Sequence, residues 1–97
     1  MIVRFRKRPI EIDTVLWTGD NLTEVQAFVG LKPGTSLPGF LVDLHGNAHV
    51  WNDQEKCYVQ TPVLHRVARG ALDEYYPISP AALDATFDEV GPVGVAP

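Results

Sequence analysis

The stretch FLVDLHGNAHVWNDQEKCYV, residues 40–59, decides the fold, because it predicts three short strands that follow one another closely. Apolar side chains in residues 40–44 predict the first strand, and Gly46-Asn47 suits the positive φ angles of a tight hairpin turn. Residues 49–51 and 56–59 predict the second and third strands, each antiparallel to the one before. This part of the chain is therefore expected to form an antiparallel meander.

Before the meander, the sequence predicts a strand and then a helix. Apolar and polar residues alternate through residues 2–17, with a break at Pro9, which cannot donate a hydrogen bond to a sheet. Asn21, with Glu24 three positions later, matches the start of a helix, and Gly30 suits a left-handed helix end. The helix has about two turns, so it depends on packing against the sheet.

After the meander, the chain again alternates between extended and helical patterns. Residues 66–69 predict a strand that stops at a glycine, and a further short strand contains Tyr75-Tyr76. Ser79-Pro80 is typical of the first turn of a helix. We expect the chain to be extended once more over residues 87–90, because acidic residues are unfavourable at the negative end of a helix dipole.

The order of these elements, β-α-β-β-β-β-α-β, predicts an α+β fold. We expect a single small, mostly antiparallel sheet of about five to six strands, with one or two short helices packed on it. A chain of 97 residues holds one hydrophobic core, so we expect one domain over residues 1–90. Residues 91–97 contain only small residues and helix breakers and predict a disordered tail.

Charge is distributed unevenly along the chain. The formal net charge is -4, yet residues 1–8 hold Arg4, Arg6, Lys7 and Arg8, half of the 8 basic side chains. The rest of the chain carries the other 4 basic side chains and all 12 acidic ones. Binding to a nucleic-acid duplex requires a broad basic face that neutralises several phosphates. Extended nucleic-acid binding is therefore not expected.

The cysteine content and the apolar runs indicate a compartment. Cys57 is the only cysteine, so no internal disulfide can form, and this favours a reducing environment. The chain does not open with the apolar region of a secretory signal, and no later apolar run approaches the roughly 20 residues that span a bilayer. We expect a cytoplasmic protein that does not enter membranes.

The polar residues form no recognisable reactive centre. Cys57 and His65 are the one plausible Cys–His pair, but neither belongs to a catalytic motif, and a free cysteine usually behaves as a small hydrophobic residue. The carboxylates of Asp73-Glu74 and of Asp88-Glu89 are neighbours that point to opposite faces of an extended chain. No phosphate-loop or dinucleotide motif is present, so we expect no enzyme and no cofactor.

A metal site would have to combine histidines with carboxylates. His45 and His49 flank the predicted hairpin turn, where their side chains could approach each other, and His65 lies farther along the chain. None of them belongs to a Cys-x-x-Cys or His-Glu-x-x-His pattern. Solvated turn histidines are the simpler interpretation, and no metal site is predicted.

The sequence does contain aromatic and arginine side chains, the residue types that recur at interfaces and anion sites. The candidate binding residues are Arg6, Arg8, Trp17, Trp51, Arg66, Arg69, Tyr75 and Tyr76. The alternative is that the aromatic residues belong to the core and the arginines lie on the solvated faces of strands.

Motifs at both ends of the chain indicate a family. Residues 5–9 read Phe-Arg-Lys-Arg-Pro and residues 17–21 read Trp-Thr-Gly-Asp-Asn, while Gly70 and residues 74–77, Glu-Tyr-Tyr-Pro, precede Thr86-Phe87 near the end. These motifs resemble those of a family of small proteins, common in bacteriophages and prophages, whose molecular role is poorly defined. The resemblance implies a phage or prophage origin and a small accessory protein in the bacterial cytosol. It supplies no catalytic residues.

Together these observations predict an accessory binding protein without catalytic activity. It would engage a host protein or sequester a small anionic signal, such as a defence nucleotide. A protein partner requires an exposed apolar patch or sheet edge, whereas a nucleotide requires a concave, positively charged pocket. The alternative is a structural or assembly protein that acts as a homo-oligomer through a large apolar self-interface.

Overall fold

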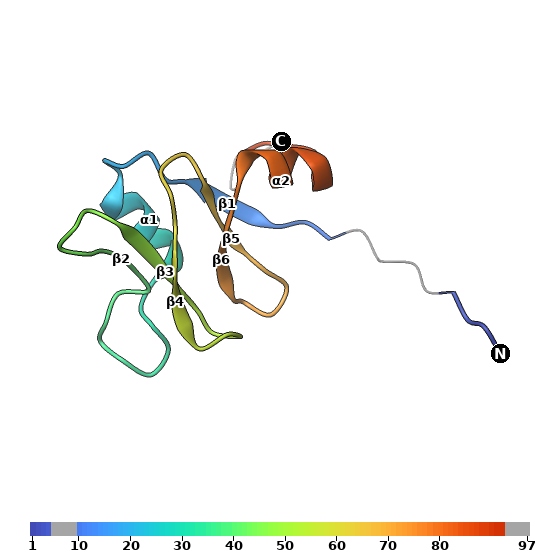
Figure 1. Ribbon diagram of the computed structural model, residues 1–97, viewed down its shortest axis with the longest axis horizontal. Helices are drawn as coiled ribbons and strands as arrows, with labels where there is room; N and C mark the ends of the chain where they lie inside the picture. The colour runs from blue at the N-terminus through green and yellow to red at the C-terminus, as the bar shows by residue number, and fades with distance from the viewer. Residues whose placement is uncertain (5–9, 93–97) are drawn as a thin grey trace.

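The computed structural model describes residues 1–4 and 10–92, and in that part of the chain two small sheets lie beside two short helices (Figure 1). The elements are, in chain order, β1 (Asp13–Leu16), α1 (Leu22–Val29), β2 (Phe40–Val42), β3 (Ala48–Asn52), β4 (Cys57–Gln60), β5 (Arg66–Arg69), β6 (Tyr75–Ile78) and α2 (Pro80–Thr86). All strand pairs are antiparallel, and the predicted α+β class is confirmed.

The first sheet, β2-β3-β4, is the meander that residues 40–59 predict. Phe40 of β2 pairs with Val50 of β3, and the tight turn between these strands contains Gly46 with a positive φ of 83°. Buried and half-buried residues alternate along β3, because every second side chain of a strand points to the same face. One face of this sheet therefore belongs to the core.

The second sheet has the strand order β1-β5-β6, so β1 and β6 are its edges. Val67 of β5 lies opposite Val15 on one side and Pro77 on the other. A proline is tolerated within β6 because an edge strand has positions where no amide hydrogen is required. All residues of β1 and β6 are half-buried, in contrast to the alternating pattern of β3.

The two sheets and α1 enclose one hydrophobic core. Val25, Phe40, Val50 and Val67 are fully buried and come from α1, β2, β3 and β5 respectively. Trp17 lies edge-on to Phe40, with their ring centroids 5.0 Å apart. The amphipathic face predicted for α1 is thus packed against both sheets, as a helix this short requires.

A buried asparagine side chain joins the two sheets. Asn52 of β3 is 7% exposed, and its Nδ2 donates a hydrogen bond to the carbonyl oxygen of Tyr75 in β6 at 2.9 Å. β3 and β6 therefore contact each other without a ladder of backbone hydrogen bonds. The structure thus has two sheets of three strands, where the sequence predicted a single sheet.

Three local predictions differ from the structure. Among the described residues of the strand predicted over residues 2–17, only Asp13–Leu16 are paired as a strand, because β5 ends opposite Asp13 and the chain turns at Gly70. Phe87 is extended as expected, with φ -129° and ψ 147°, but no strand pairs with residues 87–90. Ser79 begins α2 as predicted, yet no residue of α2 is buried.

Two ranges, residues 5–9 and 93–97, lie outside the described residues, together with most of the predicted tail and the motif Phe-Arg-Lys-Arg-Pro. Within residues 1–4 and 10–92, no helix combines the length and the apolar character needed to cross a membrane.

Candidate binding groove

A long open groove lies between β1 and α2, and we call it the β1/α2 groove. One wall is formed by residues 10–16, and the other by α2 and residues 87–92. Its volume is about 1480 Å³, which exceeds the usual range for a small-molecule pocket. The groove has the length and openness to accept an extended segment of chain.

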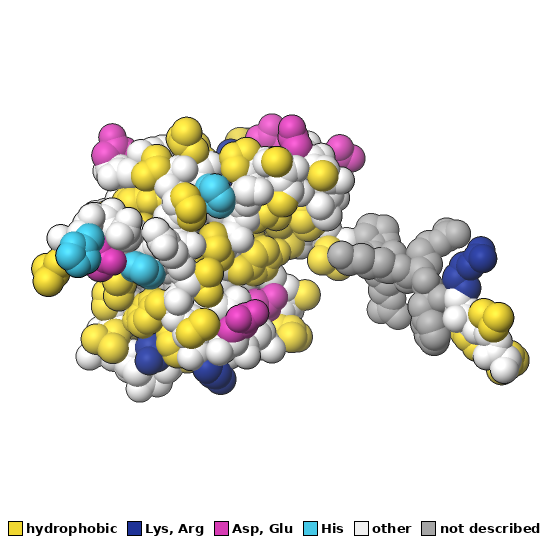
Figure 2. Space-filling view, viewed as in Figure 1, with side chains coloured by type: hydrophobic (Ala, Val, Ile, Leu, Met, Phe, Trp, Pro, Cys, Tyr) yellow, Lys and Arg dark blue, Asp and Glu magenta, His cyan; other side chains and the backbone are white. Residues whose placement is uncertain are grey.

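The groove is open because α2 does not close against the sheet. α2 has only seven residues and buries none of them. Leu83 of α2 and Phe87, the residue that follows α2, are half-buried and line the groove. Figure 2 shows hydrophobic side chains exposed below α2, and acidic side chains on α2 itself.

Within residues 1–4 and 10–92, no strand pairs with β1 on the side away from β5. The amide of Trp17 donates to the carbonyl of His65 at 3.0 Å, and backbone groups of an antiparallel strand alternate in direction from one residue to the next. Those of Thr14 and Leu16 therefore point to the free edge. The Leu16 carbonyl accepts a hydrogen bond from Asn21 Nδ2 at 2.7 Å, so the free edge ends there.

This role of Asn21 differs from the helix cap that the sequence predicts. Asn21 stands at the N-cap of α1 but makes no side-chain cap hydrogen bond. Its Nδ2 instead donates to Glu24 Oε1 and to the Leu16 carbonyl, both at 2.7 Å. The predicted Asn21–Glu24 pairing is thus present, and it ties the start of α1 to the end of β1.

Exposed apolar side chains accompany the free edge. Ile10, before β1, is 44% exposed, Leu64 is 59% exposed, and Val90, after α2, is 84% exposed. All three line the groove. Apolar residues grouped along a concave surface are typical of a binding site rather than of an ordinary solvated face.

The charge of the groove is acidic. Among the described residues, its lining contains six acidic and two basic side chains, namely Glu11, Asp13, Glu24, Asp84, Asp88, Glu89, Arg66 and Arg69. The surplus of carboxylates gives the groove a negative potential, and such a potential attracts cationic ligands and repels anionic ones.

Both arginines of the groove are already engaged within the protein. Arg69 Nη2 donates to Asp13 Oδ2 at 2.5 Å, and its guanidinium lies 5.6 Å from the centroid of the Phe28 ring. The neighbouring Tyr75 side chain and the Asp13 carboxylate raise the pKa of Arg69. Arg66 Nη1 donates to Thr14 Oγ1 at 3.3 Å. Arg69 is thus ion-paired, whereas Arg66 is hydrogen-bonded to a neutral hydroxyl and its single charge is outweighed by the carboxylates of the groove.

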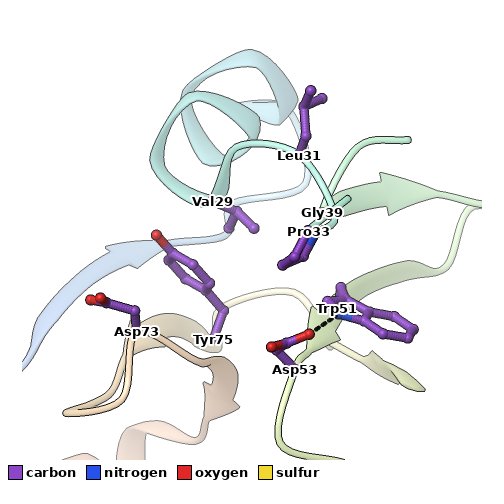
Figure 3. A pocket seen from close by; sticks show the side chains of 8 residues that line it. All are labelled: Val29, Leu31, Pro33, Gly39, Trp51, Asp53, Asp73 and Tyr75. Carbon is purple, nitrogen blue, oxygen red and sulfur yellow. Dashed lines mark hydrogen bonds between the residues drawn. The ribbon is translucent and has the colours of Figure 1, made fainter. Parts of the chain in front are cut away.

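A second, much smaller hollow lies beside α1 and β3 (Figure 3). Val29, Trp51, Asp53 and Tyr75 are among the side chains around it, and Trp51 Nε1 donates to Asp53 Oδ1 at 3.2 Å. Its volume is about 40 Å³, room for a water-sized ligand only. This hollow cannot hold a nucleotide.

The exposed face of Trp51 is covered by the protein's own lysine. Lys32 Nζ lies 4.1 Å from the centroid of the Trp51 ring and 5.9 Å from that of Tyr58. The Trp51 and Tyr58 rings meet edge-on with centroids 5.2 Å apart. This cation–π cluster stabilises β3 against β4 and leaves little aromatic surface for a ligand.

The structure separates the candidate binding residues predicted from the sequence. Trp17 is 4% exposed and belongs to the core, so its prediction as a binding residue is wrong. Trp51 and Tyr75 lie at the small hollow, and Tyr75 also packs edge-on against Phe28. Only Arg66 and Arg69 line the groove.

Of the other three candidates, only Tyr76 belongs to the described part of the chain, and it does not line the groove. Tyr76 is half-buried in β6, and burial raises the pKa of its hydroxyl. Arg6 and Arg8 lie outside the described residues.

Sequence reasoning missed the residues that make the groove. The sequence predicted a short helix after Ser79 and an extended segment over residues 87–90, and it did not indicate that Leu83, Asp84 and Asp88 would line one groove. The one available signal was the acidic excess that follows residues 1–8.

The predicted reactive groups are dispersed. Cys57 is exposed on β4 rather than buried as expected. His49 Nε2 and Asp43 Oδ2 are 2.9 Å apart beside the first turn of the meander. Among residues 1–4 and 10–92, no three His, Cys, Asp or Glu side chains are grouped closely enough to hold a metal ion.

Comparison of the chain with known protein families, with curated proteins and with solved structures finds no match.

Proposed function

We propose that this chain is a small binding protein without catalytic activity, which takes an extended peptide segment of apolar and basic side chains into the β1/α2 groove. The observation that carries this proposal is the free backbone edge of β1 within a groove that is both apolar and acidic.

The free edge provides the backbone part of recognition. An extended segment that adds to a sheet edge gains affinity from main-chain hydrogen bonds and specificity from pockets for alternate side chains. The outward-facing groups of Thr14 would form such bonds. Leu83 and Phe87, which α2 leaves half-exposed, would contact the apolar side chains of the added segment.

The charge of the groove favours a protein partner over a small anion. Six carboxylates surround two arginines that are already hydrogen-bonded to Asp13 and Thr14. A nucleotide would meet this negative potential, whereas lysine and arginine side chains would be attracted to it. We therefore favour the host-protein form of the prediction over the sequestration of a nucleotide signal.

The motifs at residues 5–9, 17–21 and 74–77 resemble those of the phage and prophage family. On that basis we propose that the protein is phage-encoded and acts in the cytosol of the bacterial host. The second candidate function, a homo-oligomeric structural or assembly protein, is favoured by one observation. Residues 1–8 of the chain itself have the apolar and basic composition that the groove would select.

Synthetic peptides test the proposed function. A labelled octapeptide of alternating valine and arginine is held at a fixed low concentration. The full chain is added to it in increasing amounts, starting from the lowest concentration at which fluorescence anisotropy detects binding. A valine–glutamate octapeptide is the matched control. We expect the arginine peptide to bind, the glutamate peptide not to bind, and binding to weaken as salt is added. A cyclic-nucleotide panel is titrated in parallel.

Groove variants decide where the peptide binds. Asp84→Lys combined with Asp88→Lys should weaken arginine-peptide binding by about tenfold, because two attractive charges become repulsive. Glu55→Lys, which reverses an exposed charge in the other sheet, should leave binding unchanged. Binding of a nucleotide but of neither peptide would overturn the proposed function.

A further inference from the structure

From the chemistry of the groove we infer that its occupant is the leading segment of a second copy of this chain, residues 2–8, which adds to the free edge of β1 in a reciprocal dimer. This inference rests on the proposed function and names the partner of the same groove. It is carried by the composition of residues 1–8, by the equal lengths of residues 2–8 and residues 10–16, and by the direction of the backbone groups of β1.

Charge and exposure make the leading segment a suitable occupant. Met1–Arg4 lies apart from the folded body (Figure 1), and the side chain of Ile2 is 100% exposed. Residues 1–8 carry four basic and no acidic side chains, together with Ile2, Val3 and Phe5. The groove has the opposite charge and an apolar lining. Segment and groove are thus complementary in both properties.

The leading segment and the stretch of chain that it would pair with also have the same number of residues. Residues 2–8, if extended in the complex, would span about 20 Å at roughly 3.4 Å per residue, which equals the span of an extended stretch of residues 10–16. Residue 9 lies between the two segments, so a two-fold axis could pass between the two copies of residue 9. Residues 2–8 of each copy would then run antiparallel to residues 10–16 of the other, with residue 2 opposite residue 16 and residue 8 opposite residue 10. Both copies would then contribute the same surface, as in most protein dimers.

The direction of the backbone groups supports this register. Thr14 points to the free edge, so even-numbered residues would hydrogen-bond across the interface as far as Leu16, whose carbonyl already accepts a hydrogen bond from Asn21 Nδ2. Pro9, which has no amide hydrogen, is odd-numbered and would not be required to donate there. The same register places Lys7 opposite the partner's Glu11, and Val3 opposite the partner's Val15.

A charge-swap experiment tests the second copy directly. The segment variant combines Arg4→Glu, Arg6→Glu and Arg8→Glu, and the groove variant combines Asp84→Lys, Asp88→Lys and Glu89→Lys. Sedimentation equilibrium should show the unmodified chain as a dimer that weakens with salt, and each variant with a dissociation constant raised on the order of 100-fold. An equimolar mixture of the two variants should restore a dimer, because each segment again meets a groove of opposite charge.

The outcomes separate this inference from the proposed function. An unmodified chain that is monomeric at every concentration overturns the second copy as occupant, whereas arginine-peptide binding would still support the proposed function. Dimers that persist in both variants, or a mixture that stays monomeric, also overturn it. Circular dichroism verifies that each variant is folded, and Glu55→Lys is the control that should dimerise normally.

A cross-link provides a second, independent test of the register. In a Cys57→Ser background, Lys7→Cys with Glu11→Cys should yield a covalent dimer on mild oxidation, since opposed residues that do not share backbone hydrogen bonds lie close together. Either substitution alone should not cross-link in this register. No covalent dimer from the double variant, or equal cross-linking by the single variants, would refute the pairing.

Discussion

The β2-β3-β4 sheet and the β1-β5-β6 sheet each have three short strands, but they differ in how they form and in what they expose. The first is built from neighbouring hairpins, and β3 alternates between buried and half-buried residues. The second brings β1 against β5 from far along the chain, and every residue of β1 and β6 is half-buried. Both sheets contribute to the core, whereas β1 of the second sheet is the edge that borders the groove.

This difference indicates a division of roles. Phe40 and Val50 of the first sheet and Val67 of the second are fully buried, while the acidic and apolar lining of the groove surrounds β1. Free sheet edges are normally protected because they invite pairing with another chain. An edge that is instead bordered by α2 and its carboxylates is suited to selective pairing.

The largest effect should come from the core next to the first sheet. Phe40→Ala removes a fully buried ring that packs edge-on against Trp17, so the free energy of unfolding should fall by about 3–5 kcal/mol. Leu83→Ala, at the groove, should cost about 1 kcal/mol or less, since Leu83 is half-exposed. Urea denaturation measures both. Equal losses for the two variants would contradict the division between core and groove.

The next effect concerns the joint between the sheets. Asn52→Ala leaves the Tyr75 carbonyl without its donor, and the amides of Gln54 and Glu55 without their acceptor. We expect the free energy of unfolding to fall by about 1–3 kcal/mol, the usual cost of buried polar groups that lose their hydrogen bonds. Thermal unfolding measures the loss. Gln54→Ala, at an exposed position of the same turn, should leave stability almost unchanged.

The smallest effect should appear at the first turn of the meander in acid. The Asp43 side chain accepts a hydrogen bond from His49 and from the amides of Asn47 and His45, and these interactions lower its pKa from 3.8 to about 2. Because the pKa is lower in the folded state, the stabilisation is complete above about pH 4 and is lost as the pH falls toward 2.

Replacing this carboxylate isolates its contribution. The difference in thermal midpoint between the unmodified chain and Asp43→Asn should shrink as the pH is lowered from 4 to 2, because the native carboxylate becomes protonated over that range. A difference that stays constant across this range would show that the titration of Asp43 does not contribute. The effect should remain local to the meander and leave arginine-peptide binding at neutral pH unchanged.

Local signals predicted the first sheet well and the second sheet less well. The meander over residues 40–59, α1 and the Ser79 start of α2 all follow from side chains and turns within a few positions of one another. The limits of β1 do not, because they depend on where β5 ends, some fifty residues later. Trp17 was misassigned for the same reason, since only packing against Phe40 distinguishes a core ring from a binding ring.

The sequence by itself determined the α+β class, the meander, both helix starts and the contrast between a basic leading segment and an acidic body. These properties reside in composition and in short-range periodicity. Only the tertiary structure decided that the strands form two sheets, that Asn52 joins them, and that carboxylates from β1, α1 and α2 gather in one groove. The physical reason is that such contacts join residues distant in sequence, and side-chain packing selects them after the local elements are specified.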